Sequence, residues 1–316
     1  MSSKKERSAI RSPRFEKHFG GEPKRIALEV GAQSAWIGRQ LKEMGHEVIV
    51  ANARQVKWIT ASDQKSDRVD AKKLAWLARA DARLLAPIEH RSAEQQAELS
   101  VIRARDAIVR ARTLLVNAAR GIAKNFGQRL PATVTPTFGK RALKVVPPVL
   151  LPALTGLLEQ IDDLGEQILD YEERIAQAGA KHPEVARLIS IPGVGTLTAL
   201  TFVLTLGRAE RFSHSRDVAA YLGLRPRQRQ SGGLDPQLGI SKSGDKYLRK
   251  LLVQCAHHTL GHWGRDSALR QWGLAKGGRA KGASRRAIVA VARKLAVLLH
   301  RLWVTGDSYK PFPKAA

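Results

Sequence analysis

The chain has very little cysteine, few acidic residues and no long uninterrupted apolar segment. Its single cysteine, Cys255, lies in the apolar run LLVQCAHHTL, so a disulfide framework within one chain is excluded and a small buried side chain is expected. No apolar segment follows the basic N-terminus, and the longest apolar stretches are interrupted by prolines or by Arg293 and Lys294. We therefore expect a soluble, cytoplasmic protein that does not contact a membrane.

The scarcity of acidic residues contrasts with an excess of basic ones. The chain has 54 Lys and Arg against 28 Asp and Glu, which gives a formal net charge of +26. Such a balance is expected of a protein that neutralises many phosphates, because duplex DNA carries about one negative charge per 1.7 Å of its axis. Ribosomal and architectural proteins share this charge, so composition indicates a nucleic-acid partner without identifying it.

The N-terminal part, residues 1–90, has the pattern of an α/β domain. Two short apolar segments, 25–31 and 47–53, flank an amphipathic one, which predicts a strand-helix-strand unit. The segment 71–80 then has a helical pattern. A chain of 316 residues is long enough for more than one such domain.

The rest of the chain is predicted to be helical. In residues 91–180, two long amphipathic helices at 92–125 and 153–179 are expected to pack antiparallel as a coiled-coil arm, with a proline-rich turn or hinge at 131–152. Residues 181–316 are expected to form a helical domain, so the fold class is α/β plus all-α. The arginines of the first long helix either contact phosphates or form a solvated face: Arg103, Arg105, Arg110, Arg112 and Arg120.

The run Ile-Pro-Gly-Val-Gly at 191–195 suits a helix-hairpin-helix turn. Gly193 and Gly195 would let backbone N–H groups approach a phosphate at a helix N-terminus. A purely structural turn between two helices has the same local pattern, so DNA binding and chain packing both remain open.

A small group of carboxylates is the first candidate for chemistry. Asp67 and Asp70 are three residues apart, which places both on one face at the start of a helix, and Glu29 ends a strand that could lie beside them. Such oxygen ligands suit Mg²⁺. Acidic residues in a first helical turn more often complement the helix dipole, and spacing does not separate the two interpretations.

The second candidate is Ser231, in the segment RQRQSGG. A hydroxyl beside glycines is accessible, and arginines could hold a phosphate against it. A flexible turn has the same composition. The basic residues expected to bind DNA here are Arg225, Arg227, Arg229, Lys242 and Lys246.

Several of these pieces occur in a recognisable order. PGVG, AYLGL, a basic stretch, QSG and ISKSGDKYLR follow one another between Leu188 and Leu252, and ALEVG and SDRVDAKKLA precede them. In this order they resemble transposases of the IS110/IS116/IS902 family. The resemblance implies a RuvC/RNase H-like domain with an Asp-Glu-Asp-Asp tetrad, in which Glu29, Asp67 and Asp70 are the last three members and hold Mg²⁺.

The same resemblance implies further properties. Ser231 falls where the family has its nucleophilic serine, so the expected function is cutting and rejoining DNA for an insertion sequence. A homo-oligomer whose two centres meet across subunits is implied, as is a guide RNA.

The chain departs from the family at the first tetrad aspartate, which has no match before Glu29. We therefore expect an N-terminally truncated copy with only part of the RuvC-like sheet. Two alternatives to an active transposase follow: a truncated copy that only binds nucleic acid, and a RuvC-like junction nuclease that uses carboxylates alone.

Overall fold

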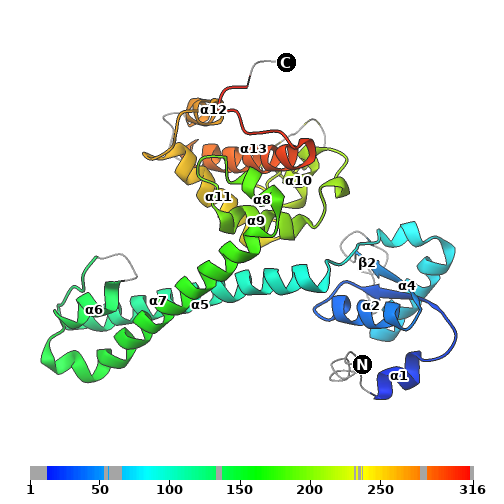
Figure 1. The fold of residues 1–316 in the computed structure, drawn as a ribbon, viewed down its shortest axis with the longest axis horizontal. Helices are drawn as coiled ribbons and strands as arrows, with labels where there is room; N and C mark the ends of the chain where they lie inside the picture. Colours follow the sequence, from blue (N-terminus) through cyan, green and yellow to red (C-terminus); the bar gives the residue numbers. More distant parts are fainter. Residues whose placement is uncertain are drawn as a thin grey trace. The chain divides into compact units, whose positions relative to one another are not determined.

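The structure is a computed structural model that describes residues 13–52, 56, 66–132, 137–230, 233, 236, 238–277 and 283–313. The chain divides into two compact units, Met1–Ser92 and Ala93–Ala316 (Figure 1). Most described residues are helical, and the one sheet found among them has two strands. None of the helices in the described ranges is both long enough and apolar enough to span a membrane.

The first unit is built around the predicted strand-helix-strand motif. Strands β1 (Arg25–Glu29) and β2 (Glu47–Ala51) pair in parallel, with Arg25 opposite Glu47 and Glu29 opposite Ala51. Helix α2 (Ser34–Glu43) makes the crossover that parallel strands require. The remaining elements of this unit are α1 (Pro13–Phe19), α4 (Asp67–Ala80) and η1 (Ala82–Leu85).

Helix α4 packs against β1 and η1 and closes a small core. The buried residues of this core come from β2, α4 and η1, with Val56 between β2 and α4. They are Ile49, Ala51, Val56, Leu74, Ala78 and Leu85.

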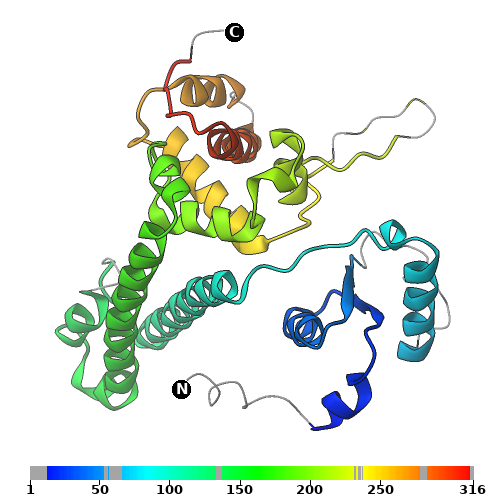
Figure 2. The ribbon, with the colours of Figure 1, turned by 45° about the vertical axis from the view of Figure 1, so that its right-hand side comes forward.

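The second unit begins with the predicted arm. Helices α5 (Ala93–Asn125) and α7 (Leu151–Ala180) lie side by side and antiparallel (Figures 1 and 2). Leu154, Leu158 and Ile161 are fully buried, as the apolar stripe of α7 predicts.

The proline-rich segment between these helices is more ordered than a hinge. Its described part contains α6 (Phe138–Leu143) and η3 (Pro148–Leu150), and Phe138 is fully buried against the arm. The expectation of a turn or hinge region missed these helices, which are possible because the prolines lie outside α6 or at helix starts, where they break no helical hydrogen bond.

The C-terminal body is entirely helical in its regular elements. Helix α9 (Thr196–Leu206) is its centre, since every residue from Thr198 to Leu206 is buried. Long helix α13 (Ala283–Thr305) packs against α10, α11 and α12. The other elements are α8 (Pro183–Leu188), η4 (Ala209–Arg211), α10 (Ser215–Tyr221), α11 (Lys246–Leu260) and α12 (Ala268–Lys276).

Candidate functional site

The three predicted metal ligands lie on two packed elements of the first unit. Glu29 is the exposed last residue of β1, and Asp67 and Asp70 lie in the first turn of α4. Ser66 caps this helix, because its hydroxyl accepts a hydrogen bond of 3.3 Å from Val69 N–H. Both aspartates therefore lie at the positive end of the helix dipole, where a carboxylate is favoured with or without a metal.

Asp70 differs from Asp67 in its surroundings. Oδ1 of Asp70 is buried and has no hydrogen-bond partner among the described atoms, whereas Asp67 is exposed. A buried oxygen left without a donor costs about 1–3 kcal/mol, so a bound cation would relieve an existing penalty.

The described residues do not complete a metal site. Within them, no three His, Cys, Asp or Glu side chains are grouped closely enough to hold an ion. The carboxylate donors are of the type that Mg²⁺ prefers, and the buried oxygen of Asp70 favours a cation, but Glu29, Asp67 and Asp70 are not brought together as one set of three ligands.

Ser231 itself lies outside the described residues, but the segments before and after it are described. They run antiparallel, and Figure 2 shows the two arms leaving the helical body side by side. We call the two described arms, residues 223–230 and 238–242, the serine hairpin. Its base is joined by backbone hydrogen bonds from Arg227 N–H to Gly239 O (3.1 Å), Ser241 N–H to Arg225 O (2.9 Å) and Lys242 N–H to Gly223 O (3.1 Å).

The three predicted arginines lie along the first arm of the hairpin. Arg225, Arg227 and Arg229 are all exposed and occupy alternate positions of this arm. Arg225 Nη2 donates to Gln228 Oε1 at 2.9 Å. The arm therefore carries a row of guanidinium groups that ends two residues before Ser231.

Two glycines lock the base of the hairpin to the body. Gly223 and Gly244 have φ of +69° and +72°. A Cβ at Gly223 would overlap the backbone of Ser243, and one at Gly244 would overlap the carbonyl oxygen of Tyr221. The end of AYLGL and the loop of ISKSG therefore pack backbone against backbone, which only glycine permits.

Arg249 holds the same two loops together. Its Nη1 donates to Leu222 O at 2.8 Å and to Ser243 O at 2.6 Å. We call Gly223, Gly244 and Arg249 the loop clamp. Sequence reasoning missed this role, although Arg249 is the arginine that ends the motif ISKSGDKYLR.

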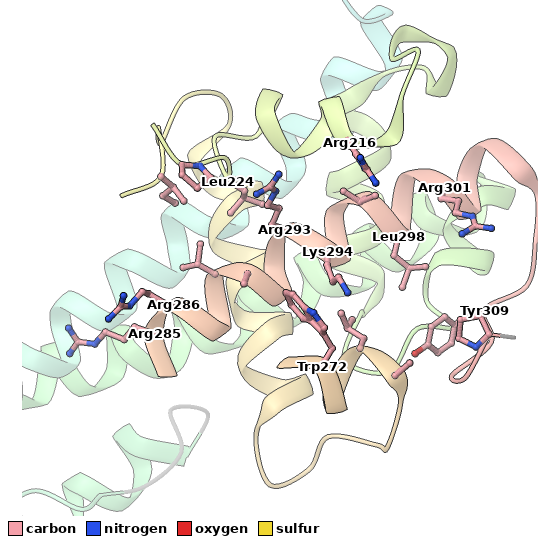
Figure 3. A pocket seen from close by; sticks show the side chains of 18 of the residues that line it. Arg216, Leu224, Trp272, Arg285, Arg286, Arg293, Lys294, Leu298, Arg301 and Tyr309 are labelled. Carbon is pink, nitrogen blue, oxygen red and sulfur yellow. The ribbon is translucent and has the colours of Figure 1, made fainter. Parts of the chain in front are cut away.

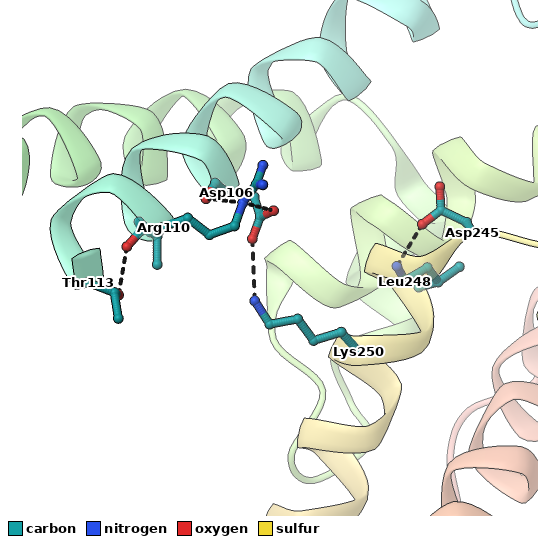
Figure 4. Close-up of polar contacts among 7 residues, drawn as sticks. Asp106, Arg110, Thr113, Asp245, Leu248 and Lys250 are labelled. Atoms are coloured by element: carbon teal, nitrogen blue, oxygen red, sulfur yellow. Dashed lines mark hydrogen bonds and ion pairs between the residues drawn. The ribbon is translucent and has the colours of Figure 1, made fainter. Parts of the chain in front are cut away.

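The two predicted lysines lie beside the clamp. Lys242 is exposed and has φ of +57°, an unusual conformation for a residue with a side chain. Lys246 is the exposed first residue of α11, a helix capped by Asp245, whose Oδ1 accepts a hydrogen bond of 2.8 Å from Leu248 N–H (Figure 4). Both lysines are thus placed at the foot of the serine hairpin.

The Pro-Gly-Val-Gly turn joins α8 to α9, and its two glycines have different surroundings. Gly193 has φ of +88°, and a Cβ there would lie 2.9 Å from Nδ1 of His258 on α11. The backbone of Gly193 is therefore in close contact with another part of the protein. Gly195 is the exposed N-cap of α9, and a Cβ there would meet nothing within 4 Å, so a phosphate can still reach the backbone at that position.

Arginines of the arm make more internal contacts than the sequence suggested. Arg105 pairs with Glu172 on α7, and Arg110 pairs with Asp106 at 3.1 Å. Asp106 also lies 3.4 Å from Nζ of Lys250 on α11 (Figure 4). Several charges of the arm therefore tie α5 to its neighbours.

Two family models match the parts of the chain in which these residues lie. The family model described as "Transposase IS116/IS110/IS902 family" matches residues 185–272, and a transposase model of the IS110 DEDD type matches residues 15–126. The first range contains the serine hairpin and the clamp. The second contains all three carboxylates.

Individual relatives extend over most of the chain. A transposase for insertion sequence element IS1328 from Yersinia enterocolitica is 35% identical over 237 residues, which is 73% of this chain and 69% of the relative. A transposase for IS1111A from Coxiella burnetii is 31% identical over 292 residues, covering 89% and 77%. A pilin gene-inverting protein from Moraxella bovis is 34% identical over 110 residues, covering 34% and 33%.

Proposed function

Because the chain belongs to the IS116/IS110/IS902 family of insertion-sequence transposases, we propose that it cuts and rejoins DNA with Ser231 as its nucleophile. The observation that carries the proposal is the serine hairpin, an arginine-rich segment with a base fixed by backbone hydrogen bonds and the loop clamp. A fixed base restricts where the serine and the bound phosphate can lie relative to each other, which favours reaction.

The basic residues around the hairpin have separate roles in this proposal. Arg225, Arg227 and Arg229 bind the non-bridging oxygens of the scissile phosphate, for which the planar guanidinium is well suited. Lys242 and Lys246 bind phosphates on either side. The exposed backbone at Gly195 provides a further phosphate contact at the start of α9.

The proposed reaction has two transfers. The Ser231 hydroxyl attacks phosphorus and loses its proton, the bond from phosphorus to the 3′ oxygen breaks, and the departing 3′ oxygen takes up a proton. The DNA is then linked through its 5′ phosphate to serine. In the second transfer a 3′ hydroxyl attacks that phosphate and loses its proton, a new phosphodiester forms, the bond from phosphorus to the Ser231 oxygen breaks, and the serine takes up a proton.

We further propose that Glu29, Asp67 and Asp70 contribute to a Mg²⁺ site. The buried, unpartnered Oδ1 of Asp70 supports this role. Bound Mg²⁺ would stabilise negative charge on the phosphate oxygens. Because the described residues provide an incomplete ligand set, the remaining ligand must come from elsewhere in the chain or from a second copy in an oligomer.

Trapping the serine-linked intermediate tests the proposal. The full chain would be incubated with Mg²⁺ and a DNA substrate nicked close to the cleavage site, so that the second strand end diffuses away and rejoining fails. Wild type should give a covalent protein–DNA adduct on a denaturing gel, and Ser231→Ala should give none. Ser241→Ala is the matched control, because it removes an exposed hydroxyl from the second arm of the same hairpin.

The outcomes separate the candidate mechanisms. Adduct formation by wild type and by Ser241→Ala, but not by Ser231→Ala, supports the serine mechanism. Unchanged DNA cleavage by Ser231→Ala without any adduct would contradict it and identify a nuclease that uses carboxylates alone.

One observation favours a second function, nucleic-acid binding without cleavage. It is the incomplete carboxylate group among the described residues. A chain limited to this function would bind DNA with a steep salt dependence because of its charge of +26. It would form neither an adduct nor a cleavage product at any Mg²⁺ concentration.

A further inference from the structure

A groove of about 1320 Å³ runs along α13 in the second unit. Its walls are formed by α10 and the base of the serine hairpin, by α12, and by the C-terminal segment around Tyr309 (Figure 3). This segment is held in place by a backbone hydrogen bond of 2.9 Å from Ala268 N–H to Pro311 O. Small-molecule pockets are typically about 300–1,000 Å³, so the groove has room for an extended ligand.

The charge lining the groove has one sign. Among the described residues that line it, eight are Lys or Arg and none is acidic. Five of them lie on α13 in two neighbouring rows, one with Arg285, Arg293 and Arg301, the other with Arg286 and Lys294. Successive members of a row are eight residues apart, which corresponds to about 12 Å along the helix.

These charges are available to a ligand. In the described part of the chain, none of the five is joined to a carboxylate in an ion pair. Arg285, Arg293 and Arg301 are exposed. A groove lined by charges of one sign concentrates counter-charged ligands, so the expected occupant is a polyanion.

The floor of the groove is apolar and aromatic. Val289, Val297 and Leu298 of α13 face Leu269 and Trp272 of α12 across it. Nζ of Lys294 lies 3.9 Å from the centroid of the Trp272 ring. A ligand that carried only phosphates would gain nothing from such a floor, whereas exposed bases stack on aromatic rings and bury apolar surface.

We propose that this groove binds unpaired nucleotides, with phosphates on the basic rows of α13 and bases against Trp272 and the apolar floor. A duplex keeps the faces of its bases inside the stack and presents only their edges, so it cannot use the floor in this way. Leu224, Pro226 and Lys242 of the serine hairpin line the same groove. The bound strand therefore continues to the foot of the segment that carries Ser231.

The inference rests on the proposed function, because it assumes that nucleic acid reaches the serine hairpin. It adds a binding path and a preference for unpaired strands. DNA and RNA share the chemistry that the groove recognises, and the experiment below compares both.

Binding of short labelled oligonucleotides to the full chain tests the groove. Fluorescence anisotropy would compare unpaired DNA, unpaired RNA and duplex DNA of equal length over a range of salt concentrations. The double variant Arg293→Ala/Arg301→Ala should bind unpaired strands about tenfold more weakly. Its salt slope should fall by about 1.4, since each phosphate contact to a single strand contributes about 0.7.

Two further variants isolate the parts of the proposal. Lys140→Ala/Arg141→Ala removes two exposed charges from α6, outside the groove, and should bind within about twofold of wild type. Trp272→Leu keeps an apolar side chain but removes the stacking ring. It should weaken unpaired strands about fivefold or more and leave duplex binding unchanged.

Three results would overturn the groove as a site for unpaired nucleotides. Equal losses of oligonucleotide binding in the α13 and α6 double variants would show that binding depends on net charge alone. Equal losses of single-stranded and duplex binding in Trp272→Leu would exclude stacking. Competition by poly-glutamate as effective as by an unlabelled oligonucleotide would indicate a site for acidic peptides.

Failure of the groove and failure of the serine mechanism give different results. The two are read separately, because binding of unpaired oligonucleotides reports on the residues of the groove and adduct formation reports on the Ser231 hydroxyl. Loss of binding only in the groove variants, with no adduct from wild type, would support the groove and contradict the serine mechanism. Normal adduct formation by wild type, together with unchanged oligonucleotide binding by the groove variants, would support the serine mechanism and contradict the groove. Whichever of unpaired DNA and unpaired RNA binds more tightly is the strand that the groove prefers.

Discussion

Glu29, Asp67 and Asp70 depend on one short strand and the first turn of one helix, beside a buried cluster that includes Leu74, Ala78 and Leu85. The serine hairpin, by contrast, stands on a body whose central helix α9 is buried from Thr198 to Leu206. Its base is held by backbone hydrogen bonds and by the loop clamp. The two candidate centres therefore differ in how their geometry is fixed.

The base of the serine hairpin is therefore preorganised, whereas the carboxylate group still lacks a complete set of metal ligands in the described part of the chain. The clamp fixes backbone positions before any ligand binds, so substitutions there should affect stability first and activity as a consequence. The carboxylates form an incomplete ligand set, so substitutions there should affect activity with little change in stability. The predictions below test this contrast, in order of decreasing effect.

The largest effect is expected from Gly244→Ala. The new Cβ would overlap the Tyr221 carbonyl oxygen at a φ of +72°, so we expect a loss of about 4 kcal/mol in the free energy of unfolding of the second unit. Urea unfolding followed by helical circular dichroism would measure it. Gly207→Ala is the matched control, because its φ is +82° with nothing within 4 Å of a Cβ. Its positive φ alone should cost about 1–3 kcal/mol, and equal costs for both variants would mean that close packing at the clamp is unimportant.

Arg249→Ala should have the next largest effect. It removes hydrogen bonds from a charged donor to Leu222 O and Ser243 O, so we expect a loss of about 2–3 kcal/mol. Hydrogen exchange at the amides of Ser241 and Lys242 should accelerate, because the hairpin base opens. Arg265→Ala, a change of an exposed arginine outside the clamp, should stay within about 0.5 kcal/mol of wild type. Unchanged exchange at the hairpin base in Arg249→Ala would contradict the clamp.

Asp70→Asn should have a small effect on stability and a large one on activity. The amide is cheaper to bury than a carboxylate whose Oδ1 has no partner, so we expect a change of at most about 0.5 kcal/mol without Mg²⁺. Adduct formation with Mg²⁺ should fall at least tenfold. Destabilisation by more than about 2 kcal/mol would show instead that Asp70 is structural, and would remove the contrast between the two centres.

The smallest expected effect concerns His90 in the first unit. Burial, and then the charges of Arg39, Arg91 and Lys42, lower the pKa of His90. The unfolded chain therefore takes up a proton at a higher pH than the folded one, and stability falls as the pH decreases from about 7 to about 5. His90→Gln should reduce this fall in thermal unfolding experiments. An identical pH dependence in the variant would show that other groups are responsible.

Periodic patterns in the sequence predicted the local elements well. The apolar segments at 25–31 and 47–53 became β1 and β2, and the helices expected at 92–125 and 153–179 were confirmed with ends within two residues. Such elements are predictable because buried positions recur every two residues in a strand and every three to four residues in a helix. Helix α6 was missed, since a single buried turn around Phe138 is too short to show a period.

Contacts between distant segments were not predictable in the same way. The clamp joins Gly223 to Gly244 and Arg249, and the groove combines rows on α13 with Trp272 on α12. The motifs AYLGL and ISKSGDKYLR contain the clamp residues, but the role of these glycines and of the arginine was missed, because it appears only when the loops meet. The spacing of Asp67 and Asp70 likewise placed two candidate ligands on one turn, while a complete metal site would depend on tertiary or subunit contacts.

Mapping the covalent DNA linkage on the wild-type chain tests the central claim most directly. The trapped adduct would be digested with a protease and a nuclease, and the peptide that retains a nucleotide would be sequenced by mass spectrometry. The account predicts a single modified residue, Ser231, on the peptide from the serine hairpin. A nucleotide attached to any other residue, or cleaved DNA without a modified peptide, would contradict it.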